Sequence, residues 1–137
     1  MRTPTALHWS RSYFDGMRLY TDGDHAGAER ALREAVALAA RMRPRDARLA
    51  GSLYALARLR QVHGRLGEAQ RLYRHALAVE RQALGADHPY TRDIAHACAN
   101  VARQIAWRDA MKRRRRPAAT GRTVVSRAAP ARLVAVA

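Results

Sequence analysis

Cysteine, long apolar runs and signal-like segments are scarce or missing in this sequence. Cys98 is the single cysteine among 137 residues, so no disulfide can form within the chain, and a reducing compartment is expected. No stretch approaches the roughly 18 consecutive apolar residues of a membrane span. The N-terminal segment carries one arginine, Arg2, and lacks the apolar core of a secretory signal. A cytoplasmic protein is therefore expected.

Acidic and aromatic residues are also few. The chain has 11 Asp and Glu against 26 Lys and Arg, a net charge of +15, so an anionic partner has to be considered. Aromatic residues make up 6% of the chain although 48% of it is hydrophobic, and alanine supplies much of that apolar fraction. Such a composition suits closely packed helices better than a β-sandwich.

The residue patterns of catalytic and metal sites are absent as well. The six histidines show neither HExxH nor Cys–His spacing, and the acidic residues are dispersed along the chain. Gly64 and Gly67 lie in a helical pattern with no strand before them, which excludes a phosphate-binding glycine loop. His88 is interpreted as a turn residue and Cys98 as a small buried apolar residue. The sequence thus predicts a protein that is not an enzyme and has no cofactor, no metal and no small-molecule substrate.

What the sequence does contain is a strong helical periodicity between Leu49 and Pro89. Apolar residues recur at steps of three and four on both sides of a turn at 63–65, which predicts two antiparallel helices. Gly64 can adopt the left-handed conformation that ends a helix. Small residues on the stripes let the two backbones approach closely. The stripes comprise Leu49, Leu53, Leu56, Ala57, Leu59 or Arg60, and Val62 before the turn, and Leu66, Ala69, Leu72 or Tyr73, Ala76, Leu77 and Leu84 after it.

The same pattern occurs once more, 41 residues earlier. Helices are predicted over 6–21 and 25–41, with Asp24 as the N-cap of the second and Pro44 as the breaker after it. A fixed offset across small and apolar positions is the signature of a helical solenoid. The corresponding pairs are Gly16 and Ala57, Ala28 and Ala69, Leu32 and Tyr73, and Ala35 and Ala76; the first helix also carries the apolar residues Leu7, Tyr13, Phe14, Met17 and Tyr20.

A fifth helix should begin near Pro89, because proline is tolerated in a first helical turn. Two registers against the second repeat are open. A 42-residue step from Leu56-Ala57 reaches Cys98-Ala99, whereas Asn100-Val101-Ala102 also resembles the repeat; the first is favoured because it requires no insertion. No second helix follows. The fold class is all-α: a short α-solenoid of five helices and about two and a half repeats, with a flexible lead-in at 1–5, a repeat domain at 6–107 (repeats 6–44 and 45–88, and a partial one at 89–107) and a basic, largely disordered tail at 108–137.

The stretch from Leu49 to Pro89 resembles the tetratricopeptide repeat, in the longer form found in kinesin light chains. The matching segments are Leu56-Ala57, Gly64-Arg65, Glu68-Ala69, Leu72-Tyr73, Ala76-Leu77 and Leu84-Gly85-Ala86-Asp87-His88-Pro89. The resemblance implies stacked helical hairpins, and an adaptor that binds a protein or peptide on the concave face lined by the first helix of each repeat.

The resemblance also implies which residues line that face. They are Tyr13, Met17 and Tyr20 in the first repeat, Tyr54, Arg58 and Gln61 in the second, and His96, Asn100 and Arg103 in the third. Aromatic rings with interspersed arginine suit an extended peptide or an acidic C-terminus. Alternatively, Tyr13 and Tyr54 only pack between repeats. The asparagines that hold a peptide backbone in kinesin light chains are replaced near Tyr54-Ala55 and His96-Ala97. Because the chain has only about two and a half repeats, its repeat ends are exposed, and a homodimer could form there.

The basic tail is the second candidate site. From Arg108 onward nine basic residues face one acid, a net charge of +8. The run Lys112, Arg113, Arg114, Arg115 and Arg116 could bind the phosphates of nucleic acid or an anionic membrane surface, while the repeats dimerise or recruit. No aromatic residue follows Trp107, so such binding would be independent of base sequence. The alternative is a solvated tail.

Further expectations concern the ends of this tail. The fifth helix can extend to Arg116, and disorder is expected over 117–137. The segment Ala131–Ala137 could add as a strand to a partner's sheet. A secretion-type chaperone built on similar repeats fits the length but not the basic charge.

Overall fold

The chain forms five α-helices in the computed structural model, which describes residues 4–43 and 45–117. They are α1 (Pro4–Thr21), α2 (His25–Arg41), α3 (Ala47–Val62), α4 (Leu66–Leu84) and α5 (Pro89–Arg115). No strand occurs within the described ranges, so the predicted all-α fold is confirmed. Helix α1 begins two residues earlier than expected because Pro4 takes the first-turn position that proline tolerates. Residues 1–105 form one compact unit and 106–137 a second.

The helix ends follow local chemistry that is visible in the sequence. Asp24 caps α2, its carboxylate accepting a hydrogen bond of 2.9 Å from the backbone N–H of Gly27. Asp46 caps α3 in the same way, accepting from the N–H of Arg48 at 2.9 Å. Gly64 has φ +75°, the left-handed conformation expected at this turn. Pro44 lies outside the described residues.

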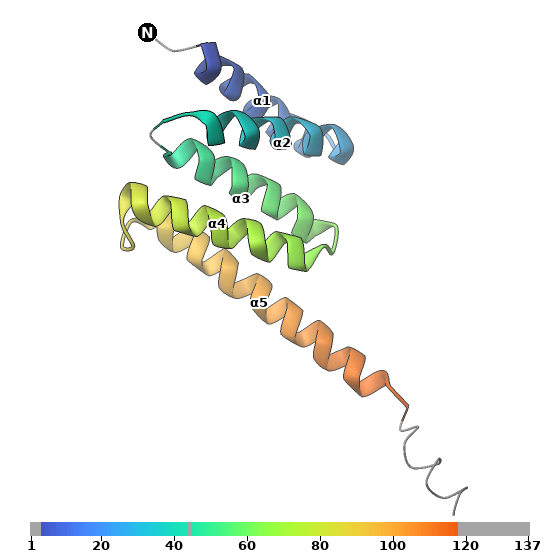
Figure 1. The fold of residues 1–137 in the computed structure, drawn as a ribbon. Helices are drawn as coiled ribbons and strands as arrows, with labels where there is room; N and C mark the ends of the chain where they lie inside the picture. The colour runs from blue at the N-terminus through green and yellow to red at the C-terminus, as the bar shows by residue number, and fades with distance from the viewer. Residues whose placement is uncertain (1–3, 44, 118–137) are drawn as a thin grey trace, which may run out of the picture. The chain divides into compact units, whose positions relative to one another are not determined.

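The first four helices form two antiparallel hairpins that follow one another in chain order (Figure 1). Residues 41 positions apart occupy equivalent buried places in the two hairpins. Ala28 and Ala69 are both fully buried, as are Ala35 and Ala76, and their small side chains allow the close contact between backbones. The internal repetition expected from the sequence is therefore present in the core.

Helix α5 occupies the position of a first helix in a third repeat. Its buried residues Thr91, Ile94 and Val101 follow the buried Leu49, Ser52 and Leu59 of α3 by 42 residues. The other register would place the exposed Ala102 and Gln104 at the positions of the buried Ala57 and Leu59. Burial thus supports the 42-residue register. Ile94 packs with Ala76 and Val79 of α4, and Val101 packs with Ala57 and Tyr73.

A buried arginine takes part in the packing between the hairpins. Arg60, 9% exposed, lies beside the core residue Leu59 and is paired with Glu29 of α2 at 2.6 Å and with Glu68 of α4 at 3.2 Å. Arg65 approaches the same two carboxylates. The sequence left Leu59 and Arg60 as alternatives for one apolar position. The structure buries both, one as a core residue and the other in an ion-pair network.

Four residues expected on apolar stripes are instead exposed. Leu7 and Phe14 are 53% and 63% exposed, and they lie seven residues apart on a side of α1 that no described helix covers. Val62 and Leu84, 57% and 40% exposed, are the last residues of α3 and α4, so no further turn of their own helix follows to cover them. The exposed side of α1 is thus an unpaired repeat end.

Helix α5 extends to Arg115, so the first eight residues of the predicted tail are helical. Arginine and lysine favour helix, and their positive charge at a helix C-terminus complements the macrodipole, which offsets the mutual repulsion of the run. The predicted disorder after Pro117 and the predicted strand at 131–137 fall outside the described residues. None of the helices described is long and apolar enough to cross a membrane.

Candidate functional site

The nine residues predicted to line a concave face border two adjoining hollows. The α1–α3 hollow, about 150 Å³, is lined by Tyr13, Met17, Tyr20, Leu32, Tyr54, Ala55 and Arg58. The α3–α5 hollow, about 590 Å³, is lined by Tyr54, Arg58, Gln61, Tyr73, Asp93, His96, Ala97, Asn100 and Arg103. Tyr54 and Arg58 border both, so the two hollows form one surface across α1, α3 and α5.

Helical spacing accounts for this convergence. Within each of the three helices the lining residues recur at steps of three or four, which places them on one side of the helix. Because these helices hold equivalent positions in successive repeats, their lined sides face the same surface. The half-buried residues are mainly aromatic, whereas Arg58, His96, Asn100 and Arg103 are exposed.

The tyrosines contribute to packing and to the surface at once. Tyr13 stacks on Trp9 with ring centroids 5.4 Å apart, and Tyr54 meets Tyr73 edge to face at 5.5 Å. The alternative that Tyr13 and Tyr54 pack between repeats is therefore compatible with their lining the hollows. Burial raises the pKa of the Tyr13 hydroxyl, and the nearby Arg58 opposes that shift in part. Tyr13 thus remains a neutral phenol that can donate a hydrogen bond.

Gln61 is a positioning residue as well as part of the lining. The Tyr73 hydroxyl donates to its Oε1 at 2.8 Å, and its Nε2 donates to Oε1 of Gln104 at 2.9 Å. These bonds connect α3 with α4 and α5. The side chains of Arg58, His96, Asn100 and Arg103 have no hydrogen bond or ion pair to any described residue, so their polar atoms can bind a ligand.

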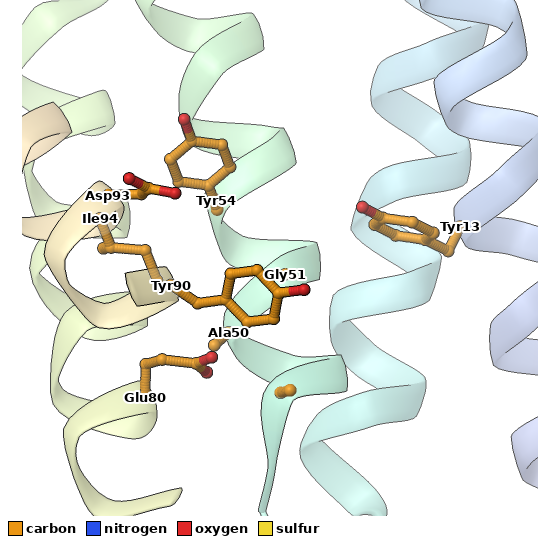
Figure 2. Close-up of a pocket in the computed structure, with 9 residues that line it drawn as sticks. Tyr13, Ala50, Gly51, Tyr54, Glu80, Tyr90, Asp93 and Ile94 are labelled. Atoms are coloured by element: carbon orange, nitrogen blue, oxygen red, sulfur yellow. The ribbon is translucent and has the colours of Figure 1, made fainter. Parts of the chain in front are cut away.

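A third hollow was not anticipated from the sequence. It has a volume of about 310 Å³, and we call it the acidic hollow because two carboxyl groups border it; its lining comprises Tyr13, Ala47, Ala50, Gly51, Tyr54, Glu80, Tyr90, Asp93 and Ile94 (Figure 2). Tyr90 and Asp93 precede His96 by six and three residues, so extending that helical stripe toward Pro89 would have found them. Glu80 carries no comparable signal, because only tertiary packing brings α4 to this surface.

Glu80 is the most unusual residue of the acidic hollow. It is 2% exposed, and its Oε2 has no hydrogen-bond partner in the part of the chain that the structure describes. Burial raises the pKa of its carboxyl group, an effect that Asp46 strengthens and His88 opposes. A buried carboxyl group without a partner is costly, which marks this position as a candidate for a ligand.

Other reactive residues do not converge on a site. No three His, Cys, Asp or Glu side chains in residues 4–43 and 45–117 are grouped to hold a metal ion. His25 and His63 form an exposed pair, with Nδ1 and Nε2 2.8 Å apart. Cys98 is half-buried, and burial raises the pKa of its thiol. Lys112 and Arg113–Arg116 are exposed at the end of α5, and none pairs with a described carboxylate.

The comparison with protein families decides what the central hairpin is. The family model described as tetratricopeptide repeat matches residues 49–90. These residues are a tetratricopeptide repeat. The repeat comprises α3 from its third residue, α4 and the start of α5, and its 42 residues are consistent with the longer form. The resemblance drawn from Leu49 to Pro89 is confirmed.

Further comparisons add nothing to this assignment: no curated protein and no solved structure matches the chain. Tetratricopeptide repeats generally mediate protein–protein interactions and are generally non-catalytic. Residues 4–41 pack in the same way as the repeat at 49–90, although the family model does not extend to them.

Proposed function

We propose that this chain is a non-catalytic interaction module that binds an extended segment of a partner protein along α1, α3 and α5. The observation that carries the proposal is the pair of adjoining hollows, which share Tyr54 and Arg58 and are bordered by all nine residues expected on the concave face. A continuous surface that crosses three repeats suits a chain segment better than a compact small molecule.

The two hollows differ in chemistry, and this difference defines the segment. The α1–α3 hollow is bordered by tyrosines and Met17, and it would take an apolar or aromatic side chain. The α3–α5 hollow offers the guanidinium groups of Arg58 and Arg103 and the amide of Asn100. Guanidinium forms strong, geometrically specific hydrogen bonds with carboxylates, so this part would take an acidic side chain or a C-terminal carboxylate.

The proposal is tested with charge reversal at the shared arginine. Arg58→Glu and its control Arg33→Glu, an exposed arginine of α2 away from the hollows, are compared with the unmodified chain in affinity capture from cell extract, with bound proteins quantified by mass spectrometry. Arg58→Glu is expected to lose the captured partner about tenfold or more, since a charge-assisted contact becomes a repulsive one. Arg33→Glu should capture it unchanged. Equal capture by both variants would refute the concave surface as the binding site.

A second candidate function rests on the exposed run Lys112–Arg116, for which no described residue supplies a carboxylate. We propose that this run binds nucleic-acid phosphates independently of base sequence, with the repeats recruiting a partner or dimerising. Replacing the five basic residues by glutamine in the full chain should abolish binding to a random 20-base-pair DNA in fluorescence anisotropy.

Salt dependence measures how much of that binding is electrostatic. Five phosphate contacts would give a slope of about −4 to −5 for log K against log salt. Arg58→Glu should leave this binding nearly unchanged. If the glutamine variant kept the slope of the unmodified chain, the run would not be the binding element.

A further inference from the structure

The acidic hollow adjoins the proposed peptide surface and differs from it in charge. Tyr54 and Asp93 border both the acidic hollow and the α3–α5 hollow, so a segment lying along α3 and α5 can reach both. The acidic hollow is bordered by the carboxyl groups of Glu80 and Asp93, and its lining includes no arginine or lysine. This is a local reversal, because residues 1–107 carry 17 arginines against 10 acidic residues.

Glu80 is the strongest indication that a ligand belongs in the acidic hollow. Figure 2 shows its side chain extending from α4 toward Ala50 of α3, beneath the ring of Tyr90. The residue is almost fully buried, and Oε2 meets no donor within the described chain. The charged groups that act on it are His88 and Asp46, of which only the histidine can become positive. A neutral donor can hydrogen-bond to Oε2, but only a cationic ligand also offsets the charge of the ionised carboxylate, and an anionic ligand would be repelled by it.

The rest of the lining favours arginine over other cations. Tyr13, Tyr54 and Tyr90 provide three aromatic rings, and Tyr90 is 63% exposed although it is large and apolar in most of its area. Guanidinium is planar, stacks on aromatic rings and donates bidentate hydrogen bonds to a carboxylate, while ammonium is a strongly hydrated point charge. A volume of about 310 Å³ is at the lower end for ligand pockets and suits a single side chain.

We propose that the acidic hollow binds an arginine side chain of the partner segment, with the guanidinium donating to Glu80 and lying against the tyrosine rings. Asp93 at the exposed end contributes a second negative charge. This inference rests on the proposed function and specifies its ligand: a segment with an arginine placed to reach the acidic hollow, and an apolar or acidic residue over the other two.

The test uses the smallest probe that carries the proposed group. N-acetyl-arginine amide is titrated into the full ¹⁵N-labelled chain and followed by ¹H–¹⁵N correlation spectra, with N-acetyl-citrulline amide as the neutral probe of nearly equal shape. Arginine amide should shift the backbone signals of Gly51, Tyr54 and Asp93 in a saturable way and bind about tenfold or more tighter than citrulline amide. Glu80→Gln should reduce arginine binding to the citrulline level. Glu34→Gln, an exposed carboxyl group of α2, is the control and should change nothing.

Each outcome decides the matter. Equal binding of the two probes, shifts elsewhere on the chain, or undiminished binding by a folded Glu80→Gln would overturn the inference. If Glu80→Gln fails to fold, Asp93→Asn on the exposed border is used instead. Its affinity for arginine amide should fall by about threefold, and its affinity for citrulline amide should not change. The amide probes do not require the partner. Failure here therefore leaves the Arg58→Glu result standing, and failure of Arg58→Glu with arginine binding intact refutes the peptide surface alone.

Discussion

At the scale of single residues, two glutamates show how pairing decides the effect of burial. Glu29 pairs with Arg60 at 2.6 Å, and this interaction lowers the pKa of its carboxyl group despite partial burial. Glu80 has no such partner among the described residues, and burial raises the pKa of its carboxyl group. The ionised form is thus favoured at one position and disfavoured at the other. Their substitutions should change stability in opposite directions.

Glu29→Gln is expected to destabilise the fold at neutral pH by roughly 1–3 kcal/mol, because Arg60 loses the closer of its two carboxylates. A lowered folded pKa gives stability that is present above the unfolded pKa and is lost as the pH falls through the folded one. The unmodified chain should therefore lose stability below about pH 4.5, and the variant should lose less over that range. Thermal unfolding followed by circular dichroism from pH 7 to pH 3 measures both. Parallel pH profiles would show that this ion pair contributes nothing.

Glu80→Gln is expected to leave the free protein as stable or to stabilise it by up to about 1 kcal/mol near pH 7. A raised folded pKa means that stability falls as the pH rises from the unfolded pKa through the folded one, and glutamine removes this loss. Urea unfolding at pH 5 and pH 8 gives the comparison, with the gain expected at pH 8. A marked loss of stability of Glu80→Gln at pH 8 would indicate that a group outside the described residues pairs with the Glu80 carboxylate.

At the scale of the helix pair, the size of one side chain decides how closely two helices approach. Gly16 takes the place in the first hairpin that Ala57 takes in the second. A Cβ at Gly16 would lie 2.8 Å from Cγ and 2.9 Å from Cδ2 of Leu32, a fully buried side chain that would have to shift. The two hairpins thus pack in the same way, but the residue at their closest helix–helix contact is glycine in the first and alanine in the second.

Gly16→Ala should therefore destabilise the protein by about 1–3 kcal/mol, the usual cost of overpacking. Gly51→Ala is the matched control, since Gly51 also lies within a helix but an added Cβ there meets nothing within 4 Å. It should stabilise by about 0.5–1 kcal/mol through helix propensity. Chemical denaturation of the two variants measures the difference in sign. A stabilising effect at both positions would show that Leu32 repacks freely.

At the scale of the whole molecule, the three hydrophobic core clusters of the described residues lie within residues 1–105. The core clusters connect neighbouring hairpins, with Ile94 and Val101 of α5 covering residues of α3 and α4. The last residue packed against a cluster is Ile105. Among the described residues after Ile105, α5 continues to Arg115, and the basic run Lys112–Arg116 lies at its end.

A chain ending at Trp107 should consequently fold, unfold in one transition and keep its midpoint temperature within about 4 °C of the full chain, a change below roughly 1 kcal/mol. A chain ending at His88 loses Ile94 and Val101 and should lose on the order of 3–5 kcal/mol. Differential scanning calorimetry of the three chains separates these outcomes. Unfolding of the Trp107 chain at a much lower temperature would assign a stabilising role to the basic residues.

Most of the fold and part of the candidate site could be predicted from the sequence. Periodic apolar residues, Gly64 and Asp24 indicated the helices and their ends, and the resemblance to the tetratricopeptide repeat implied that Tyr54, Arg58 and the other seven residues line one face. The apolar periodicity, the N-cap and the turn glycine depend only on residues close together in the sequence, so they can be recognised without the tertiary structure. Neither the role of Arg60 as an ion-pair centre nor that of Glu80 as a site residue could be predicted from the sequence, because the groups that surround them come from other helices.

The sequence by itself thus determined the repeating hairpins. Small residues, alanine or glycine, recur 41 residues apart, and two helices can approach closely only at such residues. Tertiary structure alone decided the accessibility of each side chain and the charge of each hollow. Within the part of the chain that the structure describes, it left Leu7 and Phe14 exposed, buried Glu80 without a hydrogen-bond partner for Oε2, and brought carboxyl groups from α4 and α5 to one surface. The physical reason is that helix formation depends on near neighbours, whereas desolvation and electrostatic pairing depend on residues distant in sequence.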